Sequence, residues 1–295
     1  MYDEILGGIK GKCSLISGVE LAAHLRSLRE YTRDLRKAHR KFPVYCNYAD
    51  VHVQQAYMLA YYPHYTQLLE YALNRVRYEL NNRLLLNLLL IGSGPCPEII
   101  GYLNFLNSFR KKVSLNVSIF DAVDWEFSRD ITFNYIVPNY LKDQSISNWN
   151  FKNLAINQPF KASTAFDNVD LSQPQLVVCQ NCLSEIKLAD HSTVISNFRK
   201  LYKSLPSSSI IAIIESSTNL HVSDFLASIQ ANLASEYRSK ILKDTKIGHE
   251  EITSSYRGTP PVIENNLLTG TQFEAEHDLI PRSRTKFIFS LIKKE

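Results

Sequence analysis

Residues 87–98 read NLLLIGSGPCPE and carry the strongest local signal in the chain. The apolar run Leu88–Ile91 is typical of a strand that is buried on both faces of a parallel sheet. The segment Gly92–Gly94 then predicts a tight turn, and Pro97 stands where the first turn of a helix tolerates proline. The stretch therefore predicts a strand that ends in a glycine turn and continues into a helix.

The remainder of the chain extends this alternation. Before residue 83, apolar residues recur at helical spacing, which predicts helices over 19–41, 50–62 and 64–80. Strand-sized apolar runs then alternate with helical segments, which predicts a Rossmann-like α/β fold with a mostly parallel sheet. The last run, 285–292, follows a long irregular stretch, so it is a candidate for an antiparallel strand. We expect an N-terminal helical cap or lid over residues 1–82 and a Rossmann-like domain over residues 83–295.

Composition limits the class of protein. The chain has 295 residues, of which 45% are hydrophobic and 21% charged, as in ordinary globular proteins. No apolar run reaches the ~18 residues of a membrane-spanning helix, and the N-terminus lacks the apolar segment of a signal peptide. The five cysteines are an odd number, scattered along the chain, and do not make a disulfide framework. The sequence predicts a cytoplasmic protein without a membrane partner.

The residues after the first two sheet strands limit the class of ligand that the glycine turn can bind. A dinucleotide fingerprint needs a third glycine where Pro97 stands, and the lysine of a phosphate-cradling P-loop is also missing. Asp121 ends the next strand, where a carboxylate can accept both ribose hydroxyls of an adenosine. Gly92 and Gly94 alone fit a plain strand-to-helix turn equally well. Together with Asp121 they favour an adenosine that carries no pyrophosphate.

Three segments resemble the class I S-adenosylmethionine-dependent methyltransferases: IGSGPCPEI, VSIFDAVDW and QLVVCQNCLSEI. The resemblance covers roughly residues 84–215. It implies a seven-stranded sheet, S-adenosylmethionine as cofactor, and an enzyme that transfers a methyl group. The cofactor-binding residues that it implies are Gly92, Ser93, Gly94, Pro95, Asp121, Ala122, Val123, Gln180, Asn181 and Cys182.

A narrower resemblance joins AYMLAYYPHYTQLLEYAL (56–73) to the GSGP turn and LVVCQNCLSEI. This combination is similar to the ribosomal small-subunit-associated methyltransferase-like family. The segment Leu183–Ile186 lacks the asparagine of that family's L-N-E-L motif, and the family's cysteine cluster has no counterpart.

Tyrosines crowd the break around Pro63. Tyr57 and Tyr61 are one helical turn apart and share a helix face, and Tyr65 follows one turn later. These three side chains could form an aromatic lid over the pocket or stack on a planar substrate. The alternative is that they pack the N-terminal helices onto the sheet.

Residues 18–41 are the most basic part of the chain. Such a segment fits a phosphate-binding face, and hence RNA as a partner, or a solvated helix surface. The formal charge of the whole chain is only +4. A small-molecule substrate or RNA therefore remain the two partners that the sequence suggests.

No metal site is expected. The pair Cys179 and Cys182 has the C-x-x-C spacing, but no second pair of ligands follows at a suitable distance. Methyl transfer from a sulfonium depends mainly on positioning of the nucleophile and exclusion of water. If the acceptor must lose a proton, Glu185 or Glu98 is the candidate base, and Asn181 is the candidate for contact with the methyl group.

The sequence thus predicts an S-adenosylmethionine-dependent methyltransferase that acts on a small molecule, RNA or protein. Two alternatives remain open. The glycine–proline turn also resembles nicotianamine synthase-like enzymes, which implies transfer of the cofactor's aminocarboxypropyl group. A catalytically silent binding or assembly protein could keep the same fold.

Overall fold

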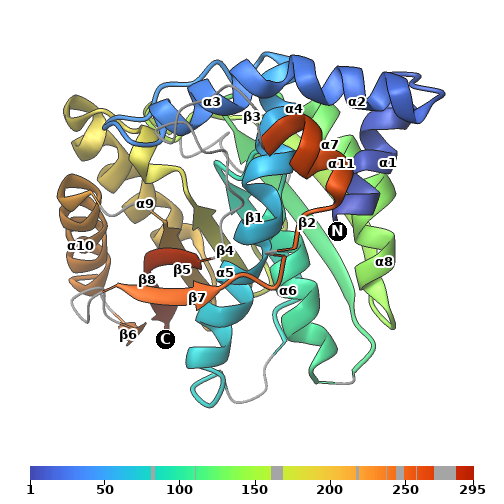
Figure 1. Cartoon of the computed structure of the whole chain (residues 1–295). Coiled ribbons are helices and arrows are strands. Elements are labelled where there is room, and N and C mark those ends of the chain that lie inside the picture. The colour runs from blue at the N-terminus through green and yellow to red at the C-terminus, as the bar shows by residue number, and fades with distance from the viewer. Residues whose placement is uncertain are drawn as a thin grey trace.

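A mixed sheet runs through the centre of the computed structural model, and helices cover both of its faces (Figure 1). The structure describes residues 1–80, 84–109, 111–160, 169–216, 219–236, 238–243, 249–256, 258–268 and 284–295. None of the helices in these ranges is both long and apolar enough to cross a membrane.

Eight strands belong to the sheet within the described ranges. They are β1 (Asn87–Ile91), β2 (Ser114–Asp121), β3 (Ser145–Asn153), β4 (Gln175–Gln180), β5 (Ile210–Glu215), β6 (Ser239–Lys243), β7 (Glu250–Thr253) and β8 (Arg284–Lys294). Seven of them follow the order β3-β2-β1-β4-β5-β8-β6, and β7 pairs with β8 off this path. The pairs from β3 to β5 are parallel, whereas β8 is antiparallel to β5, β6 and β7. The predicted Rossmann-like α/β fold with an antiparallel last strand is confirmed.

The helices before the sheet differ in detail from the predicted ones. The predicted helix over 19–41 is two helices, α2 (Gly18–Ser27) and α3 (Arg29–Ala38), and α1 (Tyr2–Lys12) precedes them. The other helices are α4 (Val51–Ala60), α5 (Tyr62–Arg75), α6 (Pro97–Asn107), α7 (Glu126–Ile131), α8 (Val137–Leu141), α9 (His191–Ser204), α10 (Leu220–Ala234) and α11 (Pro261–Ile263).

Strand β1 is apolar from Leu88 to Ile91 because both of its faces are covered. Leu88 and Leu90 belong to the hydrophobic cluster that includes α5 and α6, whereas Leu89 and Ile91 belong to the cluster with α9 and α10. Successive side chains of a strand point to opposite faces, so a strand between two helical layers needs apolar residues at every position. The uninterrupted apolar run therefore marks a central strand.

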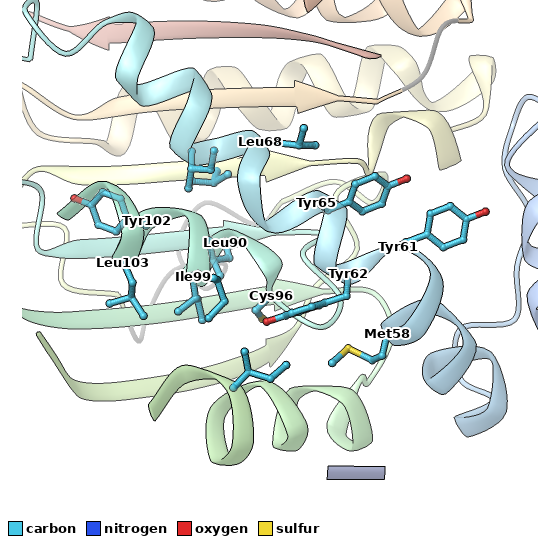
Figure 2. Packing of buried hydrophobic residues seen from close by; sticks show 14 of the residues in the cluster. Met58, Tyr61, Tyr62, Tyr65, Leu68, Leu90, Cys96, Ile99, Tyr102 and Leu103 are labelled. Atoms are coloured by element: carbon cyan, nitrogen blue, oxygen red, sulfur yellow. The ribbon is translucent and has the colours of Figure 1, made fainter. Parts of the chain in front are cut away.

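Helix α5 packs closely against α6, which leads away from the glycine turn. A Cβ at Gly101 of α6 would stand 2.5 Å from the backbone oxygen of Thr66 in α5, so glycine is what lets the two helices approach. Figure 2 shows Leu68 of α5 and Ile99 and Leu103 of α6 in the same buried cluster as Leu90.

These contacts make α5 part of the layer that covers the sheet. The division into a cap over 1–82 and a domain over 83–295 stays a prediction, and its boundary at residues 82 and 83 lies outside the described residues.

Candidate active site at the carboxyl ends of the strands

A pocket opens where the strand order reverses, at the carboxyl ends of β1 and β4. Ligands of open α/β sheets bind at this switch point. The pocket encloses about 840 Å³ of space free of protein atoms, a volume that includes open solvent at its mouth. It is lined by Tyr48, Tyr57, Gly92, Ser93, Gly94, Pro95, Pro97, Glu98, Asp121, Ala122, Val123, Trp125, Leu154, Ile156, Asn157, Gln180, Asn181, Cys182, Glu185 and Ile186.

The glycine turn forms one edge of this pocket. Gly92 has a φ of +61° and Gly94 a φ of +52°, a left-handed backbone that other residues adopt only at a cost. A Cβ at Gly92 would lie 2.6 Å from Cβ of Cys182, and one at Gly94 would lie 3.0 Å from the Trp125 ring. The glycines therefore also make room for protein side chains, which the sequence did not indicate.

Asp121, at the end of β2, binds the glycine turn directly. One carboxyl oxygen accepts a hydrogen bond from the Gly94 N–H at 2.8 Å, and the other accepts one from the Val123 N–H at 2.9 Å. Burial raises the pKa of Asp121, and these backbone bonds and the charge of Arg129 offset that effect only in part. Asp121 thus fixes the turn and still borders the pocket.

Glu215, at the end of β5, and the following Ser216 form hydrogen bonds with the turn after β4. The Asn181 backbone is left-handed, with a φ of +57°, and its side-chain oxygen accepts a hydrogen bond from the Ser216 N–H at 2.8 Å. Glu215 accepts a hydrogen bond from the Leu183 N–H at 2.6 Å. Among the described residues the buried side-chain nitrogen of Asn181 has no partner, so this donor is open to a ligand.

Carboxyl groups dominate the polar lining. Glu98 is 1% exposed, and burial raises its pKa well above the ordinary value. Burial also raises the pKa of Glu185 to about 8, an effect that a hydrogen bond with Tyr48 only partly offsets. No Lys, Arg or His lines the pocket within the described residues. Arg129 lies outside the lining and pairs with Asp124.

Three rings make one side of the pocket, which we call the aromatic wall: Tyr48, Tyr57 and Trp125. The ring centroids of Tyr48 and Trp125 are 4.8 Å apart, those of Tyr57 and Trp125 are 5.3 Å apart, and those of Tyr48 and Tyr57 are 6.1 Å apart. Tyr48 precedes α4 and Tyr57 lies within it, so the N-terminal part of the chain supplies two of the rings.

Most of the predicted site residues meet in this pocket. All ten predicted cofactor-binding residues line it, as do Glu185 and Tyr57. Tyr61 and Tyr65 do not. The Tyr61 ring stacks on His39 at 4.7 Å, and the Tyr65 hydroxyl accepts a hydrogen bond from Ser216, while its backbone oxygen accepts one from Gln180.

Sequence reasoning missed several lining residues. Tyr48, Leu154, Ile156 and Asn157 lie outside the motifs, and their presence depends on how distant segments pack. Trp125 and Ile186 end two of the quoted segments but were not predicted as site residues. Glu185, by contrast, was predicted from the QLVVCQNCLSEI segment.

Two other sequence features have a structural explanation. Sγ of Cys179 and Sγ of Cys182 are 2.7 Å apart and buried, and no group of three His, Cys, Asp or Glu that could hold a metal occurs in the described ranges. In the basic segment, Arg26 and Arg29 donate hydrogen bonds to oxygens of Asn265 and Asn266. These two arginines therefore hold the C-terminal region against α2 and α3.

Glu215 predicts a pH-dependent stability of the ligand-free protein. Burial raises its pKa to about 8 from 4.5, so between these values the folded state holds a proton that the unfolded chain has lost. The free energy of unfolding therefore falls as the pH rises through this window, by about 4 kcal/mol for this group. Urea unfolding at pH 5 and pH 8.5 should show a smaller fall for Glu215→Gln than for the wild type or for the exposed-site control Glu79→Gln. An equal fall in all three would contradict the assignment.

No protein-family model matches the chain, and no curated protein matches it. Among solved structures it is similar to the N-methyltransferase NodS from Bradyrhizobium japonicum in complex with S-adenosylhomocysteine, with 9% identity, 90% of this chain and 98% of that chain covered, and a TM-score of 0.39.

Two further solved structures are similar. The plantazolicin methyltransferase BpumL in complex with S-adenosylhomocysteine has 14% identity, coverage of 94% and 98%, and a TM-score of 0.36. A putative RNA methyltransferase from Pyrococcus horikoshii has 11% identity, coverage of 76% and 82%, and a TM-score of 0.39.

Proposed function

We propose that this chain is an S-adenosylmethionine-dependent methyltransferase. The observation that carries the proposal is the direct bond between Asp121 and the Gly94 N–H, at the switch point of the sheet. This bond brings the glycine turn and the strand-end acid to one pocket, so a single adenosine-containing ligand can contact both.

The absence of cationic side chains from the described lining residues favours this cofactor over a dinucleotide. The two phosphates of a nicotinamide dinucleotide would find no positive side chain to pair with there. S-adenosylmethionine has no phosphate, and its sulfonium and ammonium can contact the carboxyl groups of Glu98, Asp121 and Glu185, which line the pocket.

The lining residues divide naturally along the cofactor. Asp121 would accept hydrogen bonds from the ribose hydroxyls. The adenine would be covered by the apolar surface of Ala122, Val123, Leu154 and Ile156. Gly92–Pro95 would border the amino-acid portion, with Gln180, Asn181 and Cys182 opposite. When bound, the cofactor supplies an electrophilic methyl group. The task of the protein is then to align the acceptor and exclude water.

The N-terminal helices belong to this proposal as a cap. Tyr48 and Tyr57 come from residues 1–82 and close one side of the pocket. A cytoplasmic location and a small-molecule acceptor are part of the same proposal. RNA is less favoured, because two arginines of the basic segment are engaged within the chain.

Calorimetry and product analysis test the proposal. S-adenosylhomocysteine should bind the purified chain, and incubation with S-adenosylmethionine and a panel of amines should release S-adenosylhomocysteine. Release of methylthioadenosine would indicate transfer of the aminocarboxypropyl group instead. Absence of binding would favour a catalytically silent protein.

A further inference from the structure

We propose that the methyl acceptor is an amine, which enters the pocket as an ammonium ion and is held between the aromatic wall and the Glu98 carboxyl. This inference rests on the proposed function and names the substrate class of the same pocket.

The aromatic wall offers ring faces to a cation. Tyr48, Tyr57 and Trp125 are each less than 10% exposed, and all three border the pocket. Ring faces attract an ammonium group within about 6 Å of the centroid, most strongly at tryptophan. Burial raises the pKa of the Tyr57 hydroxyl, and the charges of Glu185 and Glu98 raise it further, so this ring lies near both carboxyls.

Glu98 lacks the partner that a buried carboxyl needs. Neither of its oxygens has a hydrogen bond to another residue in the described part of the chain. Asp121 differs, because each of its two oxygens accepts from an N–H group. Glu215 accepts through one oxygen, and its other oxygen has no partner among the described residues. A buried polar group without a partner is unfavourable, so an unpartnered carboxyl at a pocket surface indicates that a cationic donor of the ligand completes it.

The lining disfavours acidic acceptors. A carboxylate or phosphate would find no cationic side chain among the described lining residues, and would face Glu98 and Glu185. An ammonium meets the opposite situation, because it can donate to these carboxyls while its alkyl groups contact the rings.

Glu185 completes the reaction. Burial raises the pKa of Glu185 to about 8, but the positive charge of the bound ammonium favours the ionised carboxylate. This carboxylate takes one proton from the ammonium, which frees the nitrogen lone pair. That lone pair forms the new N–CH₃ bond while the S–CH₃ bond breaks, and the electron pair of the broken bond remains on sulfur, which becomes a neutral thioether. The product leaves as a methylated ammonium, and the proton on Glu185 passes to solvent, which this half-buried side chain can reach.

Fluorescence titrations test the cation site with two probes: methylammonium chloride, which can donate a hydrogen bond to Glu98, and tetramethylammonium chloride, which can contact the rings but cannot donate. The chain has two tryptophans, so in a Trp149→Phe background Trp125 is the sole tryptophan reporter. Trp149 lies on β3, stacked on Phe133 and outside the pocket. With S-adenosylhomocysteine at saturation, tetramethylammonium should change the Trp125 emission in a saturable way, whereas the neutral analogue tert-butanol should not.

Variants then locate the cation. Glu98→Gln and Tyr57→Leu should each weaken tetramethylammonium binding about tenfold, and the exposed-site control Tyr78→Phe should leave it unchanged. Calorimetry on each variant should show S-adenosylhomocysteine affinity within threefold of the parent, which also establishes that the variant is folded.

The possible failures are distinguishable. If the parent binds no S-adenosylhomocysteine, the proposed function fails and this inference fails with it. If S-adenosylhomocysteine binds but neither methylammonium nor tetramethylammonium gives a saturable change, or if the variants bind both ions as well as the parent, the amine inference alone is overturned. It is also overturned if Glu98→Gln weakens S-adenosylhomocysteine but not methylthioadenosine, because Glu98 would then face the cofactor's own ammonium.

Discussion

Asp121→Ala is expected to weaken binding of S-adenosylhomocysteine about 100-fold, the effect of losing two charge-assisted hydrogen bonds to the ribose. Asp121 is 7% exposed and lines the pocket, so its carboxyl is shielded from bulk water. Methylthioadenosine contains the same ribose and should lose the same factor. Isothermal titration calorimetry with both ligands measures the change.

The same substitution should alter stability by far less, because two effects oppose each other. It leaves the N–H groups of Gly94 and Val123 without their acceptor, and it also removes a carboxyl whose pKa burial has raised. We expect the midpoint of thermal unfolding to move by only a few degrees. The exposed-site control Asp143→Ala should match the wild type in both measurements. An affinity of Asp121→Ala within threefold of wild type would remove Asp121 from the cofactor site.

The central part of the fold was predictable because its signals are local. Strand β1 carries an unbroken apolar run, Leu88–Ile91, because it lies between two helical layers. The left-handed turn after it favours glycine at residues 92 and 94. Asp121 follows its strand directly, so the sequence alone places it at the same edge of the sheet as the turn.

Other elements left weaker signals. Helix α1 contains glycines at positions 7, 8 and 11, which are poor helix formers, yet a Cβ at Gly8 would lie 2.8 Å from Ile131, so tertiary packing explains that glycine. The break between α2 and α3 occurs at Leu28 without proline or glycine to mark it. Strands β6 and β7 are short and largely polar, as edge strands often are.

The aromatic wall shows why the site was only partly predictable. Tyr57 was a candidate, but Tyr48 and Trp125 become neighbours of it only when α4 packs beside the loop after β2. The unpartnered state of Glu98 is likewise a property of its surroundings. Motifs identify residues near the turn, whereas the composition of the opposite wall depends on contacts between distant segments.

Gly92→Ala should give the largest loss of stability of the substitutions proposed for this chain. Two costs coincide at Gly92: the φ of +61°, which an L side chain rarely adopts, and a Cβ position 2.6 Å from Cβ of Cys182. The backbone term is about 1–2 kcal/mol, and overpacking in a tight interior costs about 1–3 kcal/mol more. We therefore expect urea unfolding to show a loss of about 3–4 kcal/mol.

Gly18→Ala provides the matched control, because Gly18 begins α2 and a Cβ there meets nothing within 4 Å. Alanine favours a helix over glycine, so this variant should equal or slightly exceed wild type in stability. A second substitution separates the two costs at Gly92. In Gly92→Ala/Cys182→Gly the colliding Cβ atom is absent, so the loss should be smaller than the sum of the two single losses, whereas the backbone cost remains. Strict additivity would mean that Cys182 exerts no pressure on the turn, and that only the left-handed backbone requires glycine there.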